Sequence, residues 1–153
     1  MQLTKFSDFA LRVLMYTHAA GDRLVTIEEM ARSYRVSRAH LMKVVNALTR
    51  AGYLKAVRGR AGGLRLAKPA DEIRLGDVVK TTEPDFALVE CFATGNQCVI
   101  SGRCRLPGVM KEALNDFIAA LNRYTLASIA LRPEDFVHPV RTEQQPPADI
   151  SVA

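Results

Sequence analysis

The chain has 153 residues, of which 48% are hydrophobic and 24% are charged, and its formal net charge is +5 at pH 7. This length and composition predict a folded globular protein with one domain and an appended helix, and they exclude a disordered chain. No apolar run approaches the ~20 residues that a membrane-spanning helix needs, and the first residues lack the pattern of a signal peptide, so we expect a cytoplasmic protein without a membrane partner.

The positive charge is concentrated in one block of the sequence. Residues 31–70 contain ten Lys or Arg and no Asp or Glu, whereas the rest of the chain has more acidic than basic residues. Such a block is typical of a surface that binds a polyanion. We therefore expect double-stranded DNA as the first candidate partner.

Three capped helices are predicted in the first fifty residues. Thr4 can cap a helix that extends to about Ala20, and its apolar residues recur at helical spacing. Thr26 followed by Glu29 predicts a capping box, and hence a second helix that ends near Ser33. Ser37 can cap a third helix, which runs from Arg38 to about Arg50. The apolar stripe of the first helix comprises Phe6, Phe9, Ala10, Val13, Leu14 and Thr17.

The spacing of these elements predicts a mainly α-helical, winged helix-turn-helix DNA-binding region over residues 1–80. The helix-turn-helix covers about 26–51, because the turn between its two helices is very short. Residues 53–66 then form two short strands around a glycine-rich tip, which predicts a wing. A short helix from Leu75 to Lys80 ends the region.

The candidate DNA-binding residues lie at two places in this region. Residues at the start of a recognition helix face base edges in the major groove, and a capping serine with nearby N–H groups suits a phosphate. Arginines on a flexible wing tip suit the minor groove or its phosphates. The candidates are Ser37, Arg38, Ala39, His40 and Lys43 at the helix start, with Arg58 and Arg60 on the wing.

The cysteines of the chain all lie in a predicted loop over residues 81–105. Cys91, Cys98 and Cys104 are an odd number of thiols, so they cannot form a closed set of disulfides, and they are better explained as three ligands of a metal site. Structural zinc sites usually contain paired ligands two to four residues apart, and this loop has no such pair. The wider gaps favour an iron–sulfur cluster, with zinc as the alternative.

The longest periodic segment of the chain follows the cysteine loop. Pro107 is well placed at the start of a helix, and the apolar residues predict a helix over 106–132 that ends near Leu131. A small winged helix cannot bury so long an apolar face, so we expect this helix to form the interface of a homodimer; the alternative is packing against its own domain. Residues 133–153 are rich in proline and polar residues, which predicts a disordered tail.

Three segments resemble one known family. They are the opening Met-Gln-Leu-Thr-Lys-Phe-Ser-Asp, the recognition segment Ser-Arg-Ala-His-Leu-Met-Lys-Val-Val from Ser37, and the wing segment Gly-Arg-Ala-Gly-Gly-Leu from Gly59. Together with the three cysteines, they resemble the Rrf-two (Rrf2) family of winged-helix repressors, and in particular its nitric-oxide-sensing members. The resemblance covers about residues 1–131.

The resemblance implies a cofactor, a set of ligands and a signal. It implies a homodimer that binds a palindromic operator and carries one cluster per subunit, held by Cys91, Cys98 and Cys104; we expect a 4Fe–4S cluster, with 2Fe–2S as the alternative. Asp8 of the partner subunit matches the fourth ligand of the nitric-oxide-sensing members. Nitrosylation of the cluster would abolish operator binding and derepress genes for nitric oxide detoxification.

Two other functions remain as alternatives. Family members that sense cluster status or iron use a histidine three residues after the third cysteine, where this chain has Pro107. A DNA-binding protein stabilised by zinc would have no sensing role. We do not expect an enzyme, because the chain has no Cys-x-x-Cys motif, no nucleophile–base pair and no phosphate-binding loop before a helix.

Overall fold

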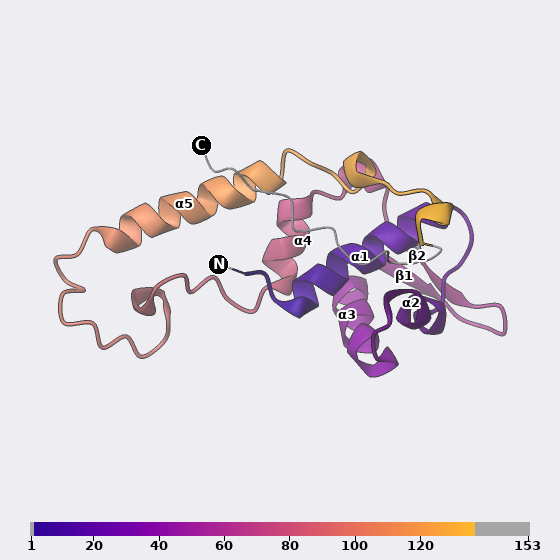
Figure 1. Ribbon diagram of the computed structural model, residues 1–153, viewed down its shortest axis with the longest axis horizontal. Coiled ribbons are helices and arrows are strands. Elements are labelled where there is room, and N and C mark those ends of the chain that lie inside the picture. Colours follow the sequence, from indigo (N-terminus) through magenta and orange to yellow (C-terminus); the bar gives the residue numbers. More distant parts are fainter. Residues whose placement is uncertain (1, 137–153) are drawn as a thin grey trace, which may run out of the picture.

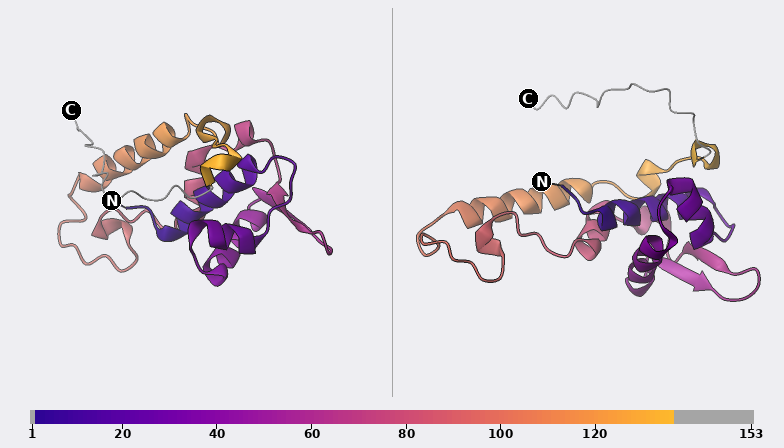
Figure 2. Two further views of the ribbon diagram at one scale, coloured as in Figure 1. Left: turned by 45° about the vertical axis from the view of Figure 1, so that its right-hand side comes forward. Right: turned by 60° about the horizontal axis from the view of Figure 1, so that its bottom comes forward.

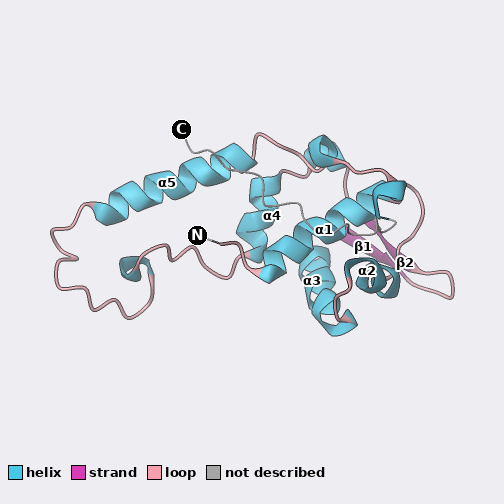
Figure 3. Cartoon of the chain, viewed as in Figure 1, coloured by secondary structure: helices cyan, strands magenta, loops and turns pink. Residues whose placement is uncertain are grey.

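The computed structural model describes residues 2–136 and consists mainly of helices with one two-stranded antiparallel sheet. Helix α1 (Lys5–Ala19) runs through the centre of the body, and it packs against α3, α4 and the sheet (Figures 1 and 3). Within residues 2–136, no helix combines the length and the apolar character needed to cross a membrane.

Helix α1 begins where the sequence predicts it. The Thr4 hydroxyl accepts a hydrogen bond from the Ser7 N–H at 3.2 Å, as expected of a helix cap. Ser7 is fully buried, although it lies outside the predicted apolar stripe, because Thr82 on α4 donates a hydrogen bond of 2.8 Å to its hydroxyl oxygen. This polar contact fixes the first turn of α1 against α4.

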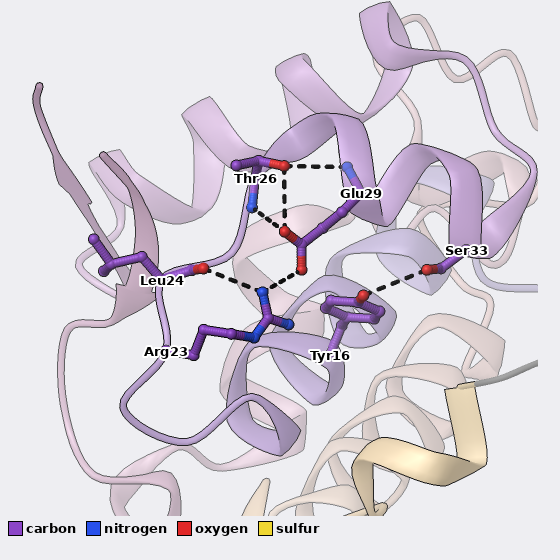
Figure 4. Close-up of polar contacts among 6 residues, drawn as sticks. All are labelled: Tyr16, Arg23, Leu24, Thr26, Glu29 and Ser33. Atoms are coloured by element: carbon purple, nitrogen blue, oxygen red, sulfur yellow. Dashed lines mark hydrogen bonds and ion pairs between the residues drawn. The ribbon is translucent and has the colours of Figure 1, made fainter. Parts of the chain in front are cut away.

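The two helices of the predicted helix-turn-helix are α2 (Ile27–Tyr34) and α3 (Arg38–Arg50). The capping box is formed, since the Thr26 hydroxyl accepts from the Glu29 N–H and the Glu29 carboxylate accepts from the Thr26 N–H (Figure 4). The turn between the helices places Arg35 in the left-handed region, with φ of 53°. The buried residues of α3 are the apolar ones predicted, Leu41, Val44, Val45 and Leu48.

The wing consists of β1 (Leu54–Val57) and β2 (Gly63–Leu66), which pair with Leu54 opposite Leu66 and Val57 opposite Gly63. Two backbone hydrogen bonds between Val25 and Leu64, of 3.0 and 2.8 Å, join the return strand to the segment before α2. The base of the wing is therefore fixed to the helix-turn-helix, while its tip extends from the body (Figure 1).

The second half of the chain forms an arm. After α4 (Leu75–Thr82), a long segment leads away from the body, and α5 (Leu106–Leu121) returns along it. Helix α5 packs against α4 near the body, and its first turns stand clear of the other helices (Figures 1 and 2). Only Ile118 of α5 is buried within this chain.

The sequence-based end of the last helix, near Leu131, is wrong. Helix α5 ends at Leu121, and residues 122–126 turn back to the body. Leu126 is fully buried in the core, and its N–H donates to the Ile73 carbonyl at 2.8 Å. The apolar spacing continues past Leu121 because Leu126 is buried in the core and Ile129 packs against it, although Tyr124 is 54% exposed. Spacing alone does not reveal the change of direction.

The predicted disordered tail, 133–153, begins within the described residues. Residues Pro133–Phe136 form a 3-10 turn, and the Phe136 ring contacts the Tyr16 ring edge to face, with 5.0 Å between the ring centroids. This aromatic contact anchors the turn on α1. Residues 137–153 lie outside the described part of the chain, so disorder there stays a prediction.

Replacing Leu126 by alanine tests whether the returning segment belongs to the core. We expect Leu126→Ala to lower the free energy of unfolding by about 2–5 kcal/mol, because it leaves a cavity at a fully buried site. Leu131→Ala is the matched control, since Leu131 is 40% exposed. Urea unfolding measures both changes, and equal small losses would contradict this account of the core.

Candidate nucleic-acid interface and cysteine loop

The start of α3 presents polar residues to solvent. Ser37, Arg38, Ala39 and Lys43 are all exposed, and the Ser37 hydroxyl accepts a hydrogen bond of 3.2 Å from the His40 N–H. This arrangement follows from the sequence, because the apolar residues of α3 hold its opposite face against the core. Four of the five recognition-helix candidates are thus accessible from one end of the helix.

His40 is placed differently from the sequence-based expectation, which put it off the apolar face. Its ring lies edge to face against Phe9 of α1, with 5.2 Å between the ring centroids. Its Nε2 atom is buried and has no hydrogen-bond partner among the described residues. Residue 40 is four positions before the buried Val44, so it borders the apolar stripe and packs between helices.

The wing tip places its two arginines in solvent. Arg58 and Arg60 are both exposed and flank Gly59 at the turn between the strands. The tip is tight, because a Cβ atom on Gly62 would lie 2.4 Å from the Val57 carbonyl oxygen. A glycine at this position therefore lets the turn close and directs the arginines away from the body.

The three cysteines are free thiols that are partly exposed. Cys91 lies in a 3-10 turn, Glu90–Phe92, and Cys98 and Cys104 stand just before and just after the turn at residues 99–103, which precedes α5. Among residues 2–136, no three His, Cys, Asp or Glu side chains lie close enough together to hold a metal ion. The donor chemistry fits an iron–sulfur cluster, but the loop must close before the three sulfurs can share one.

Parts of this loop are already ordered by hydrogen bonds. The Leu106 N–H at the start of α5 donates to the Cys104 sulfur at 3.4 Å. Asn96 accepts from the Cys98 N–H at 2.9 Å, and Ser101 donates to the Cys98 carbonyl at 2.8 Å. Sequence reasoning missed Asn96 and Ser101, although both are typical turn residues that bond nearby backbone groups.

Asp8 lies in the first turn of α1, away from the cysteine loop of the same chain in sequence. Its carboxylate accepts a hydrogen bond of 3.0 Å from Arg12 Nε, and about half of each side chain is exposed. The Arg12 guanidinium also lies over the Phe9 ring, 5.5 Å from its centroid. A role of Asp8 as a ligand in another subunit stays a prediction.

Two first-turn carboxylates of α2 have different surroundings. Burial alone would raise the pKa of Glu29, but hydrogen bonds from Arg23 and Thr26 outweigh burial, so this pKa lies below its ordinary value. Glu28 is exposed, and its Oε2 lies 3.8 Å from Arg38 Nε. Glu29 therefore stabilises the start of α2, whereas Glu28 lies close to Arg38 at the start of α3.

Comparison with known sequences identifies close relatives. Residues 3–132 match the family described as "Rrf2: Iron-dependent Transcriptional regulator". The chain is 43% identical over 139 residues to the HTH-type transcriptional regulator NsrR of Bacillus subtilis (strain 168), which covers 90% of this chain and 95% of that protein. It is 46% identical over 136 residues to protein aau3 of Rhizobium meliloti (strain 1021), with 88% of each chain covered.

Solved structures confirm the fold. CymR (YrzC), described as the global cysteine regulator of B. subtilis, superposes with a TM-score of 0.68 at 20% identity, over 85% of this chain and 96% of that one. IscR of T. potens gives a TM-score of 0.66 at 18% identity, over 95% of this chain and 94% of that one. NsrR and CymR are described as regulators, in agreement with the expectation that this chain is not an enzyme.

Replacing an arginine of the wing tip tests whether the wing contacts DNA. We expect Arg58→Gln or Arg60→Gln to weaken binding to DNA of any sequence and to lower the salt slope of log K by ~0.9 for each lost phosphate contact. Fluorescence anisotropy over a salt series measures the slope. An unchanged slope in both variants would show that the tip does not touch the phosphate backbone.

Proposed function

The chain belongs to the Rrf2 family of transcriptional regulators, and from this premise we propose that it is a DNA-binding repressor that depends on an iron–sulfur cluster and senses nitric oxide. The observation that carries this proposal is the presence of three free cysteines on one segment of a chain that also exposes a recognition helix. Its 43–44% identity to two NsrR regulators supports the choice of signal.

The DNA-binding part of the proposal rests on the exposed start of α3 and the wing. Arg38 and Lys43 would enter the major groove, and Ser37 would contact a phosphate. Arg58 and Arg60 would reach the neighbouring backbone from the tip. The absence of acidic residues between positions 31 and 70 supports this assignment, because the whole face would attract the duplex.

The dimer part of the proposal rests on α5. Leu106 is 48% exposed and Val109 is 59% exposed, although both are apolar residues on a helix. Val99 and Ile100, in the loop beside them, are 98% and 58% exposed. A second copy of the chain would cover these residues and would place two α3 helices at the spacing of successive major grooves, about 34–36 Å.

The cluster would be held by Cys91, Cys98 and Cys104 through their sulfur atoms, with Asp8 of the partner subunit as the fourth ligand. A bound cluster supplies iron that nitric oxide can attack, and an oxygen ligand leaves one iron more accessible than a fourth thiolate would. The Leu106 N–H already donates to the Cys104 sulfur and would help to position it as a ligand.

The same ligand set suggests how the signal reaches DNA. Asp8 bonds to Arg12 in this structure, so ligation and this ion pair compete for one carboxylate. Helix α1 carries Asp8 and packs against α3, so a shift of its first turn changes the position of the recognition helix. A coupling of ~1–3 kcal/mol would lower operator affinity about 5- to 150-fold.

Anaerobic titration with nitric oxide tests the proposed function. The full-length protein is purified without oxygen, and its operator is isolated by selection from random-sequence duplexes. We expect the visible absorbance of the cluster and the binding of the operator to be lost together. Loss of absorbance with unchanged operator binding would contradict nitric oxide sensing, whereas protein without iron would remove the cluster from the proposal.

The type of cluster separates this proposal from its closest alternative, a regulator of cluster status or iron. Pro107 stands where those family members have a ligand histidine, which favours the nitric oxide sensor. Mössbauer spectra of the protein as isolated give the cluster type. A 2Fe–2S signature would favour the alternative.

Replacing each cysteine tests the ligand set. We expect Cys91→Ser, Cys98→Ser and Cys104→Ser each to lose bound iron, because three thiolates from one loop are the main protein ligands. Iron and sulfide analysis after anaerobic purification measures this loss. Far-UV circular dichroism is the control for folding, and a variant that retains full iron content would remove its residue from the set.

A further inference from the structure

An exposed acidic residue lies next to the basic surface of the recognition helix. Glu28 is in the first turn of α2, and its Oε2 lies 3.8 Å from Nε of Arg38, the first residue of α3. The two side chains are 59% and 62% exposed. The next acidic residue after α2 in the sequence is Asp71, beyond the wing. Glu28 therefore borders a stretch of sequence whose charged residues are all Lys or Arg.

The cap of α2 does not explain Glu28. Glu29, the neighbouring residue, supplies the capping carboxylate and also accepts a hydrogen bond of 2.8 Å from Arg23 (Figure 4). A carboxylate in the first helical turn is favourable for the helix, but only weakly so at an exposed position. The helix is therefore capped without Glu28, and the contact of Glu28 with Arg38 calls for another explanation.

In this pair, Glu28 contacts Arg38 at Nε and not at its terminal nitrogens. The contact is made through Nε, at ion-pair distance, so the two terminal nitrogens of the guanidinium remain available. Glu28 and Arg38 both line an open cleft between the helix-turn-helix and the wing, whose other wall includes Val57 and Leu64. The Arg38 side chain thus shares one cleft with a carboxylate and with residues of the wing.

We infer that Glu28 is a positioning residue that makes Arg38 selective for a base edge over a phosphate. This inference rests on the DNA binding proposed above. A phosphate attracts Arg38 mainly by its charge, and the neighbouring carboxylate offsets a part of that attraction, as far as solvent screening of this exposed pair allows. A guanine edge is recognised by two directional N–H donors. The carboxylate does not remove these donors, and it restricts the orientations of the arginine that presents them.

The pair would therefore weaken binding to arbitrary DNA while it supports binding to the operator. An arginine side chain that is not paired with a neighbouring residue loses rotamer freedom when it binds a base. Pairing of the Arg38 Nε with Glu28 at 3.8 Å already restricts part of this freedom, so less is lost on docking. Glu28 thus raises the ratio of specific to non-specific affinity, although it adds no contact of its own to DNA.

Removing the charge of Glu28 tests this inference. For Glu28→Gln, we expect binding to poly(dI-dC) to tighten about threefold, within the range of an exposed ion pair, and its salt slope to steepen by ~0.9. We expect binding to the selected operator to weaken about threefold, because Arg38 is less restricted. Glu28→Asp, which keeps the charge, should retain most of the wild-type salt slope on poly(dI-dC).

Two controls separate this role from a general effect of charge. Glu72→Gln removes one exposed negative charge from the 3-10 turn Ala70–Glu72, which packs against the turn Ala127–Ile129 and lies outside the residues proposed to contact DNA or the partner subunit, and it should change neither affinity. In an Arg38→Gln background, Glu28→Gln should also have no further effect. Anisotropy with the full-length protein measures all of these affinities, and thermal unfolding checks that each variant is folded.

The outcomes distinguish failure of the inference from failure of the proposed function. If the wild-type protein binds neither duplex, DNA binding itself is refuted and the inference falls with it. If the wild type binds both, the inference alone is overturned by either of two results. One is an equal change on the two duplexes in Glu28→Gln, and the other is an undiminished effect of that substitution without Arg38.

Discussion

The packing of α3 on α1 is the contact on which the rest of the structure depends. Leu41, Val44 and Leu48 are fully buried on one face of α3, and they join Val13 and Leu14 of α1 in one core. Because this face is fixed against the core, Ser37, Arg38 and Lys43 at the start of α3 lie on its solvent-exposed side. Burial of a side chain of this size contributes about 1.5–3 kcal/mol, which exceeds the value of an exposed ion pair. The core therefore determines where the charges lie.

The same core also receives the far end of the arm. Leu126 fills it from the segment after α5, and Asn122 bonds the Asp77 N–H through its side-chain oxygen at 3.0 Å. There is no room for a side chain at Gly76, since a Cβ atom would lie 2.6 Å from the Ile118 carbonyl oxygen. The arm is consequently attached to the body through α4 at its beginning and through residues 122–126 at its end. A partner that binds the outer part of α5 could therefore transmit a displacement through these two attachments to residues 1–80.

The sequence predicted the features that depend on neighbours along the chain. The caps at Thr4, Thr26 and Ser37 follow local rules, and the helix boundaries near them agree with the structure within about one residue. The features that it did not predict depend on distant contacts. The buried Ser7 is satisfied by Thr82 on a helix distant in the sequence, and Leu126 enters the core five residues after α5 has ended. The proposed ligand role of Asp8 involves a contact between two chains, which no local rule predicts, so it stays a prediction.

Helix α1 carries Asp8, a proposed ligand, and it also packs against the recognition helix α3. Its first turn carries Asp8, and the next residue, Phe9, contacts the ring of His40 at the start of α3. His40 cannot turn outward to bind DNA without leaving this contact, and its buried Nε2 is not solvated where it stands. A change at Asp8 thus has a short path to the recognition helix through packed rings. This favours a role for His40 in holding the position of α3 over a direct contact with a base. Arg38 and Lys43 would then contact the base edges, and the position of α3 would determine whether they reach the major groove.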